Sequence, residues 1–352
     1  MNLVSRAISG SVAGLVMLSL GCPARSAEAA ADPCAGRTDV LGVSRIVEID
    51  GAASPRFGAQ YQDASFLEDG EVVLTFDDGP LRHYTQRVLD ALDTQCVKAT
   101  FFIVGRMAIA DPEMLKETAR RGHTIGVHTW SHKKLSTISA AKAKDEIELG
   151  LSATARALGG PVAPFFRFPY LRDTKAMVAH VGERSMGVFG IDVDSRDFTT
   201  RNPSAVPKSV ISQLQVTHKG IILFHDIQPS TAGSIKTMLA ELKAHGFRIV
   251  HMVAKSPATT LPEYDALADK EMGNKALAAA RDPTASRSAV WPVSVARAKP
   301  GAGDSDEVLP WQTETTPAPA ASPPPAALPR PPRRPEPPGV PALPWQLGPY
   351  GR

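Results

Sequence analysis

The stretch "VVLTFDDGP" (residues 72–80) places two adjacent carboxylates where an apolar run ends. A β-turn explains the stretch on its own, because Asp is favoured at turn starts and Gly-Pro breaks a strand. Side chains alternate between faces along a strand, so Asp77 and Asp78 can share one site only where the strand ends and the backbone bends. The stretch therefore predicts a strand end with a bend. A turn alone requires no more than this, and a chemical site formed by Asp77 and Asp78 requires the same bend.

Strand-like apolar runs alternate with helix-like runs from residue 71 to about residue 253. The runs "VVLTF", "ATFFIVG" and "GIILFHD" are typical of strands, whereas "RVLDALDTQ", "PEMLKETARRG" and "TAGSIKTMLAELKAHG" have helical periodicity. This alternation indicates an α/β domain with parallel strands. In parallel α/β barrels functional groups gather at the C-terminal ends of the strands, which is where the two acids lie.

Composition supports one well-buried domain with appendages: the chain has 352 residues, 43% of them hydrophobic. The formal net charge of +3 is close to balance and argues against bulk electrostatic binding to nucleic acid. Neither a P-loop nor a dinucleotide-binding fingerprint occurs.

The first 29 residues have the pattern of a secretion signal, with Arg6 before an apolar run and small residues after it. Cleavage after Ser26 or Ala29 fits that pattern, and the run is too short to predict a membrane span in the mature chain. The stretch "LSLGC", which ends at Cys22, resembles a lipoprotein box and leaves a lipid anchor open as a minor alternative. We therefore expect a protein exported to the periplasm or secreted by a bacterium.

Residues 30–70 form an N-terminal extension in which "VSRIVEID" (residues 43–50) is expected to be a short strand. Once Cys22 leaves with the signal, Cys34 and Cys96 remain. In an exported protein such a pair favours a disulfide between extension and domain, and two unrelated thiols are the alternative.

Residues 255–299 are expected to be a linker in which "DALADKEMGNKALAAA" could form a marginal helix. Residues 300–352 are rich in proline and lack the apolar content to offset ordering entropy, which predicts a disordered, extended tail. A spacer, a binding arm and a solvated tail without a specific role all remain open.

The stretch "HTWSH" places His128 and His132 at i and i+4, where they would face the same side of a helix turn and could chelate one cation. Coincidence is the alternative for a lone pair at this spacing. With Asp78 the pair makes a His-His-Asp set, which suits a catalytic zinc-type site with positions open for water and substrate.

Three further stretches indicate little when taken singly. "FFRFPY" (residues 165–170) could be an aromatic strand whose Arg167 extends to solvent. "DVDSRDF" (residues 192–198) is an acidic loop, and "GIILFHD" (residues 220–226) is an apolar strand that ends in a histidine.

Taken together, "TFDDGP", "HTWSH", "RFPY", "DSRDF" and "LFHD" resemble, in order, the five motifs of the polysaccharide deacetylases, the NodB-homology domain of carbohydrate esterase family 4. The resemblance covers residues 71–254, about half of the chain. It implies a distorted (β/α)7-type barrel that holds one divalent metal ion. Zn²⁺ is the expected ion, with Co²⁺ or another divalent ion open.

The resemblance also implies roles for the residues that match its motifs. Asp78, His128 and His132 would bind the metal, and Asp77 would be the general base, held by Arg167. Tyr170 would offer its backbone N–H to the oxyanion. Asp194 would orient His225, the general acid.

The groove would be lined by Pro169, Tyr170, Phe198 and Leu223, the last against the acetyl methyl group. Two positions depart from the family pattern: Leu171 stands where glycine is common, and Phe198 stands where tryptophan is common. Both lie on the groove, so they leave the chemistry intact and put the substrate preference in doubt.

The expected function is therefore metal-dependent removal of N-acetyl groups from acetylated amino-sugar polymers, such as peptidoglycan or chitin-like N-acetylglucosamine glycans. The expected partner is this glycan and not a nucleic acid. O-deacetylation, for example of acetylated xylan, remains an alternative because the same chemistry cleaves esters. A catalytically silent glycan-binding barrel is the alternative from another class.

Overall fold

The structure is a computed structural model that describes residues 34–61 and 65–281. The predicted secretion signal with Cys22, and the proline-rich tail, lie outside the described residues. The chain divides into two compact units, residues 1–37 and residues 38–352. The fold described below is that of the second unit.

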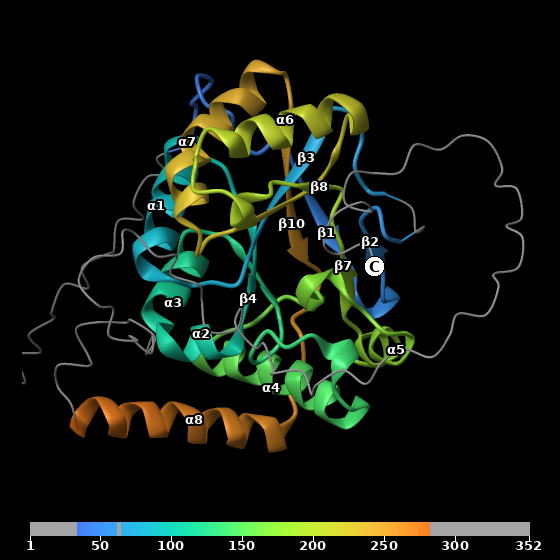
Figure 1. Ribbon diagram of the computed structural model, residues 1–352, viewed down its shortest axis with the longest axis vertical. Coiled ribbons are helices and arrows are strands. Elements are labelled where there is room, and N and C mark those ends of the chain that lie inside the picture. Colours follow the sequence, from blue (N-terminus) through green and yellow to red (C-terminus); the bar gives the residue numbers. More distant parts are fainter. Residues whose placement is uncertain (1–33, 62–64, 282–352) are drawn as a thin grey trace, which may run out of the picture. The chain divides into compact units, whose positions relative to one another are not determined.

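Strands and helices alternate along this unit as the sequence predicts (Figure 1). The strands are β1 (Arg45–Ile49), β2 (Arg56–Phe57), β3 (Glu71–Asp77), β4 (Thr100–Ile103), β5 (Thr124–Val127), β6 (Phe165–Phe166), β7 (Gly187–Phe189), β8 (Val193–Asp194), β9 (Gly220–His225) and β10 (Arg248–Ala254). The helices are α1 (Arg82–Thr94), α2 (Gly105–Ala110), α3 (Pro112–Arg120), α4 (Ala140–Leu158), α5 (Lys175–Glu183), α6 (Ala205–Thr217), α7 (Pro229–Ala244) and α8 (Pro262–Arg281).

The strands form one sheet that curls into a distorted barrel. Strand β3 pairs in parallel with β4 on one side and with β9 on the other. From β4 the sheet continues through β5 and β6 to β7, and from β9 it continues to β8. Every described strand pair is parallel. Strand β7 pairs onward with β2, and the described pairing leaves the circle open between β2 and β8. The predicted α/β fold is confirmed.

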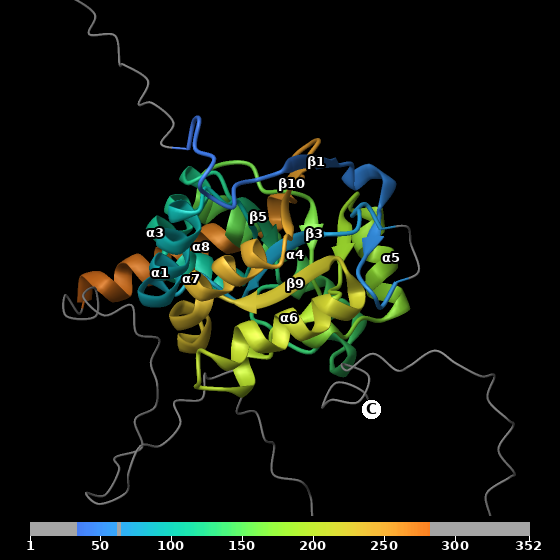
Figure 2. The same cartoon turned by 90° about the horizontal axis from the view of Figure 1, so that it is seen from above.

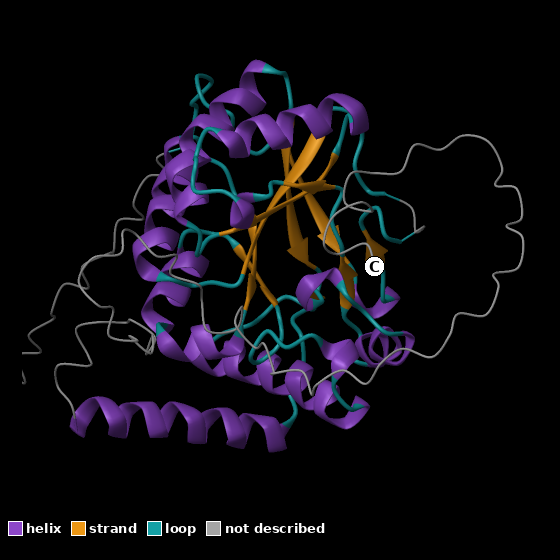
Figure 3. Ribbon diagram, in the orientation of Figure 1, coloured by secondary structure: helices purple, strands orange, loops and turns teal. Residues whose placement is uncertain are grey.

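Helices surround the strands (Figure 3). Seen from above, α1, α3 and α7 lie on one side of the strands and α5 lies on the other (Figure 2). Among the described residues no helix is both long and apolar enough to cross a membrane.

The two faces of β3 explain why Asp77 points into the barrel. Val72, Leu74 and Phe76 belong to the larger apolar cluster, which also contains the buried side chains of α1. Val73 belongs to a second cluster with aromatic side chains of β4, β6 and β7. Because side chains alternate along a strand, Asp77 follows Val73 onto the inner face, at the C-terminal end of β3.

Segments on both sides of residues 71–254 also join the packed unit. Strand β1, which confirms the strand expected in the extension, pairs with β10, and β2 pairs with β7. Helix α8 lies where only a marginal helix was expected, and its Ala268 is buried with Ala153 of α4. The predicted domain boundaries themselves stay a prediction.

Cys34 and Cys96 are each disulfide-bonded. Their pairing with one another stays a prediction, because Cys34 and Cys96 belong to different compact units.

Candidate active site

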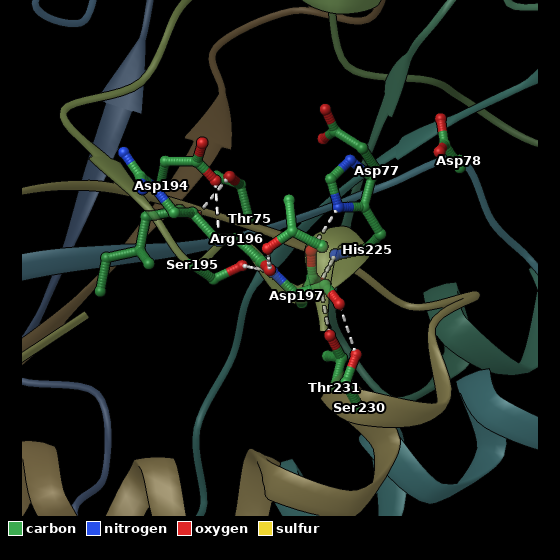
Figure 4. A network of polar contacts seen from close by, with 12 residues as sticks. Thr75, Asp77, Asp78, Asp194, Ser195, Arg196, Asp197, His225, Ser230 and Thr231 are labelled. Atoms are coloured by element: carbon green, nitrogen blue, oxygen red, sulfur yellow. Dashed lines mark hydrogen bonds and ion pairs between the residues drawn. The ribbon is translucent and has the colours of Figure 1, made fainter. Parts of the chain in front are cut away.

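The residues of the five motifs gather around one cavity at the C-terminal ends of the barrel strands. The cavity is lined by Asp77, Asp78, His128, His132, Phe168, Tyr170, Leu171, Asp194, Phe198, Leu223, His225 and Gln228. Figure 4 shows the part of this site that contains Asp77, Asp78, His225 and the residues around Asp197. Arg167 and Asp197 lie behind the lining, because both side chains are fully buried.

Asp77 and Asp78 share the site because the chain bends where β3 ends. Asp78 has a left-handed backbone conformation, with φ of 76°. As a result Asp77 Oδ2 lies 3.7 Å, and Asp78 Oδ1 3.6 Å, from the same atom, Nε2 of His128. The bend predicted from "FDDGP" is confirmed.

Asp78, His128 and His132 form a cluster of possible metal ligands, whose ligand atoms all lie within 4.8 Å of one another. His132 Nε2 is 3.3 Å from Asp78 Oδ1. His128 donates its Nδ1–H to the carbonyl of Arg167 at 2.8 Å, which leaves Nε2 as the ring nitrogen with a lone pair. A metal-ligating histidine usually donates its other ring N–H to a carbonyl or carboxylate in this way.

Two further observations, on hydrogen bonding and on protonation, indicate that these three residues suit a divalent cation. Asp78 Oδ1 is buried and has no hydrogen-bond partner within the described residues, so a cation would satisfy it. Burial lowers the pKa of both His128 and His132, and a neutral imidazole is the form that binds metal. Two imidazoles with one carboxylate suit zinc or a similar divalent ion.

The helix turn expected at "HTWSH" is wrong, although the two histidines do come together. The segment is a loop after β5, and both Thr129 and His132 have left-handed conformations, with φ of 67° and 58°. The backbone N–H of His132 donates to Thr129 Oγ1 at 3.1 Å. Loop geometry, not the 3.6-residue repeat of a helix, directs the two rings to one place.

Arg167 is buried beneath Asp77, so the alternative of a solvent-exposed arginine is excluded. Its Nη1 donates to Asp77 Oδ1 at 2.7 Å. Its other contacts are to Thr75 Oγ1 at 2.8 Å, to Phe189 O at 3.0 Å and to Gly190 O at 3.0 Å. Burial raises the pKa of Asp77 to about 6, and the guanidinium of Arg167 opposes a larger rise.

His225 pairs with Asp197, not with Asp194 as the resemblance implied. Nδ1 of His225 is 2.8 Å from Asp197 Oδ1, and the backbone N–H of His225 donates to Asp197 Oδ2 at 2.6 Å (Figure 4). The hydroxyl of Thr231 donates to the same carboxylate, and that of Ser230 to the carbonyl of Asp197. Burial lowers the pKa of His225, but Asp197 outweighs this and raises it to about 10.

Asp194 lies at the end of β8 and lines the cavity without a described bond to His225. Its Oδ1 accepts the backbone N–H of Arg196 at 2.9 Å. The side chain of Gln213 bonds both backbone groups of Asp194, at 3.0 and 2.7 Å. "DSRDF" offers two acids, and only the 3-10 turn that begins at Asp197 turns the second one beneath His225.

The walls of the cavity agree in part with the residues expected to contact substrate. Tyr170, Phe198 and Leu223 line it, and Pro169 is buried in the same turn as Tyr170 without lining it. Phe168 and Gln228 also line the cavity, although neither was expected to do so. Nothing in their local sequence marks them, because their positions depend on how the turns after β6 and β9 fold.

Comparisons with known proteins agree with this geometry. A family model described as polysaccharide deacetylase matches residues 67–187. The peptidoglycan-N-acetylglucosamine deacetylase PgdA of Listeria monocytogenes is 34% identical over 182 residues, which are 51% of this chain and 37% of the relative. A chitooligosaccharide deacetylase of Bradyrhizobium is 28% identical over 51% of this chain and 87% of the relative.

Among solved structures, the Bdellovibrio bacteriovorus peptidoglycan deacetylase Bd3279 is similar with a TM-score of 0.57 and 32% identity. The match covers 63% of this chain and 62% of that one. The match to the Listeria relative, by contrast, spans little more than a third of that protein's length. The fold, the motif order and these matches agree that the chain contains a polysaccharide deacetylase domain.

Proposed function

We propose that the chain is a metal-dependent hydrolase that removes N-acetyl groups from acetylated amino-sugar polymers, with peptidoglycan as the first candidate and chitin-like glycans as the second. The observation that carries the proposal is one cavity with a carboxylate base and a metal-ligand cluster on one side and a carboxylate-paired histidine on the other. The names of the relatives, peptidoglycan and chitooligosaccharide deacetylases, support the substrate class.

Asp78, His128 and His132 would hold one divalent ion, with Zn²⁺ the first candidate and Co²⁺ or another ion as an alternative. When bound, such an ion supplies Lewis-acid chemistry, because it polarises a carbonyl oxygen and lowers the pKa of water.

Asp77 takes the proton from the attacking water. Its pKa of about 6 leaves it ionised at neutral pH and still basic enough to accept a proton. The 2.7 Å bond from Arg167 fixes the direction of the carboxylate. The water oxygen then bonds to the acetyl carbonyl carbon, and the electron pair of the C=O bond moves to its oxygen.

His225 gives a proton to the departing amine. Its raised pKa keeps it an imidazolium at neutral pH, and Asp197 holds Nδ1 so that Nε2 is the nitrogen that donates. The C–N bond breaks as the carbonyl re-forms, and the products are acetate and a free amino sugar. Asp77 then holds the proton lost by water, and His225 has given one to the amine. Release of the Asp77 proton to solvent and uptake of a proton by His225 return the site to its starting state, and the acetic acid formed ionises to acetate.

The backbone N–H of Tyr170 is proposed to donate to the oxyanion, which would stabilise the charge that develops on the carbonyl oxygen. The side chain of Leu223, 5% exposed at the cavity, would accept the acetyl methyl group. Action on a cell-wall glycan requires export, in agreement with the secretion signal expected at residues 1–29. The place of action would be the periplasm or the cell exterior.

The test is acetate release from a panel of chitooligosaccharides, peptidoglycan and acetylated xylan, with and without a chelator. We expect metal-dependent release from the N-acetylated substrates, and a fall of about 10³-fold for Asp77→Asn because it removes a general base. Asp69→Asn, an exposed acid outside the cavity, serves as the matched control.

No release from any substrate would refute the hydrolase proposal. Release from acetylated xylan alone would replace N-deacetylation with O-deacetylation. Undiminished release by Asp77→Asn would refute the assignment of the base.

A further inference from the structure

Helix α4 carries a buried carboxylate that the proposed reaction does not use. Glu146 is 7% exposed and reaches the loop between the two histidines. Its Oε2 accepts the backbone N–H of Ser131 at 2.8 Å, and its Oε1 accepts the hydroxyl of Ser131 at 2.7 Å. Both carboxylate oxygens are therefore bonded to one residue of the "HTWSH" loop.

The backbone of α4 holds the same loop. The carbonyl of Glu146 accepts the N–H of Trp130 at 2.7 Å. One turn further along α4, a Cβ placed on Gly150 would lie 2.4 Å from the carbonyl carbon of Thr129, so only glycine allows this close approach. Glu146 thus accepts three hydrogen bonds from residues between His128 and His132, and Gly150 makes one close contact with the same segment.

The loop needs such support because its own conformation is unfavourable. Thr129 and His132 have positive φ, and a left-handed conformation is strained for any residue other than glycine. No helix or strand includes residues 128–132. Strained conformations persist where the surroundings hold them, and here the holding groups are those of α4.

We propose that Glu146 is a positioning residue that sets the separation of His128 and His132, and with it the affinity of the site for a divalent metal. Glu146 does not line the cavity, so it acts through the loop and not on substrate. The inference rests on the proposed function only in that the His-His-Asp cluster binds a metal.

The test is the Zn²⁺ dissociation constant of the metal-stripped protein, measured by competition with a chromophoric chelator and without substrate. We expect Glu146→Ala to weaken Zn²⁺ binding by about 10- to 100-fold, the range usual for loss of an outer-shell partner. Glu146→Gln should retain most of the affinity. Its amide oxygen can accept the Ser131 N–H while its NH₂ donates to the Ser131 hydroxyl.

Glu148→Ala is the matched control, because Glu148 is also a buried glutamate of α4 but bonds His180 and Arg184 instead. It should lower the free energy of unfolding and leave the Zn²⁺ dissociation constant of the folded protein unchanged. Unchanged affinity in Glu146→Ala, or an equal loss in Glu148→Ala, would overturn the inference.

Ser131→Ala covers the case in which Glu146→Ala does not fold. It removes one of the two side-chain bonds and should weaken Zn²⁺ binding by less than about tenfold, in the same direction. Wild-type affinity in Ser131→Ala would then count against the inference. The expected Zn²⁺ affinities in the wild type and in all variants, together with no acetate release by the wild type, would instead refute the proposed function alone.

Discussion

The two sides of the cavity use histidine in opposite ways. The metal-ligand side consists of Asp78, His128 and His132, and the acid side consists of Asp197 and His225. Burial lowers the pKa of His128 well below its usual value, whereas the pKa of His225 rises to about 10 although burial acts on it too. The difference lies at Nδ1, which meets the Arg167 carbonyl in His128 and a carboxylate in His225. The partner of Nδ1 therefore accounts for the opposite directions in which the pKa values of these two buried histidines move.

The largest effect should follow from breaking the metal-ligand side. We expect His128→Ala to lose metal and to lower acetate release by about 10³-fold or more, because a bound metal supplies several kcal/mol of transition-state stabilisation. Metal content by elemental analysis checks this, with the exposed His245→Ala as control. Full metal occupancy in His128→Ala would refute the ligand assignment.

A smaller effect on kcat should distinguish the roles of Asp194 and Asp197, the two acids of "DSRDF". Asp197→Asn removes the carboxylate from His225 and should lower kcat by about 10²- to 10³-fold, the range of general acid–base catalysis. Asp194→Asn leaves that pair intact and should change kcat by less than about tenfold, with its main effect on KM. Steady-state kinetics on one substrate decide the point. A greater kcat loss in Asp194→Asn than in Asp197→Asn would indicate that Asp194, and not Asp197, orients His225.

The protonation of His225 gives a third test. Its folded pKa lies above the value of about 6.5 in the unfolded chain, so its contribution to stability is complete below pH 6.5 and is lost as the pH rises through about 10. NMR titration should show His225 protonated up to about pH 10 in the wild type. In Asp197→Asn the largest of the contributions that raise this pKa is lost and only Asp77 and Asp78 still oppose burial, so the pKa of His225 should fall well below 10. If His225 of the wild type titrates near pH 6.5 instead, its pKa is not raised, and the proposed difference between His225 and His128 is wrong.

The fold and one side of the site could be predicted from local sequence. Alternating strand-like and helix-like runs predicted an α/β domain with parallel strands, whereas the barrel was implied by the family resemblance. The strand end at "FDDGP" predicted the bend that lets Asp77 and Asp78 share a site. Both depend on neighbouring residues, whose pattern is visible in the chain. The spacing of His128 and His132 indicated a candidate metal site, and the family resemblance implied its full ligand set, although the segment that joins the two histidines was wrongly expected to be a helix turn.

The acid side and the supports of the loop could not be predicted in this way. His225 and Asp197 are 28 residues apart, and the choice between Asp194 and Asp197 depends on a short turn after β8. The bonds from Glu146 to Ser131 likewise join a helix to a loop 15 residues earlier. Such contacts depend on tertiary packing, which single-sequence patterns do not encode.

The smallest effect should come from Leu171, a residue of the cavity wall that belongs to neither side. This residue lines the cavity in a left-handed conformation, with φ of 52°, which glycine adopts without steric cost. In Leu171→Gly the relief of this strain opposes the greater entropy of the unfolded chain, so the free energy of unfolding should change by no more than about 1 kcal/mol. The lost side chain widens the groove, and KM for chitooligosaccharides of increasing length should change more than kcat. The Zn²⁺ dissociation constant and the pKa of His225 should stay at their wild-type values. A shift in either would show that the wall takes part in one of the two sides, because neither property depends on substrate contact.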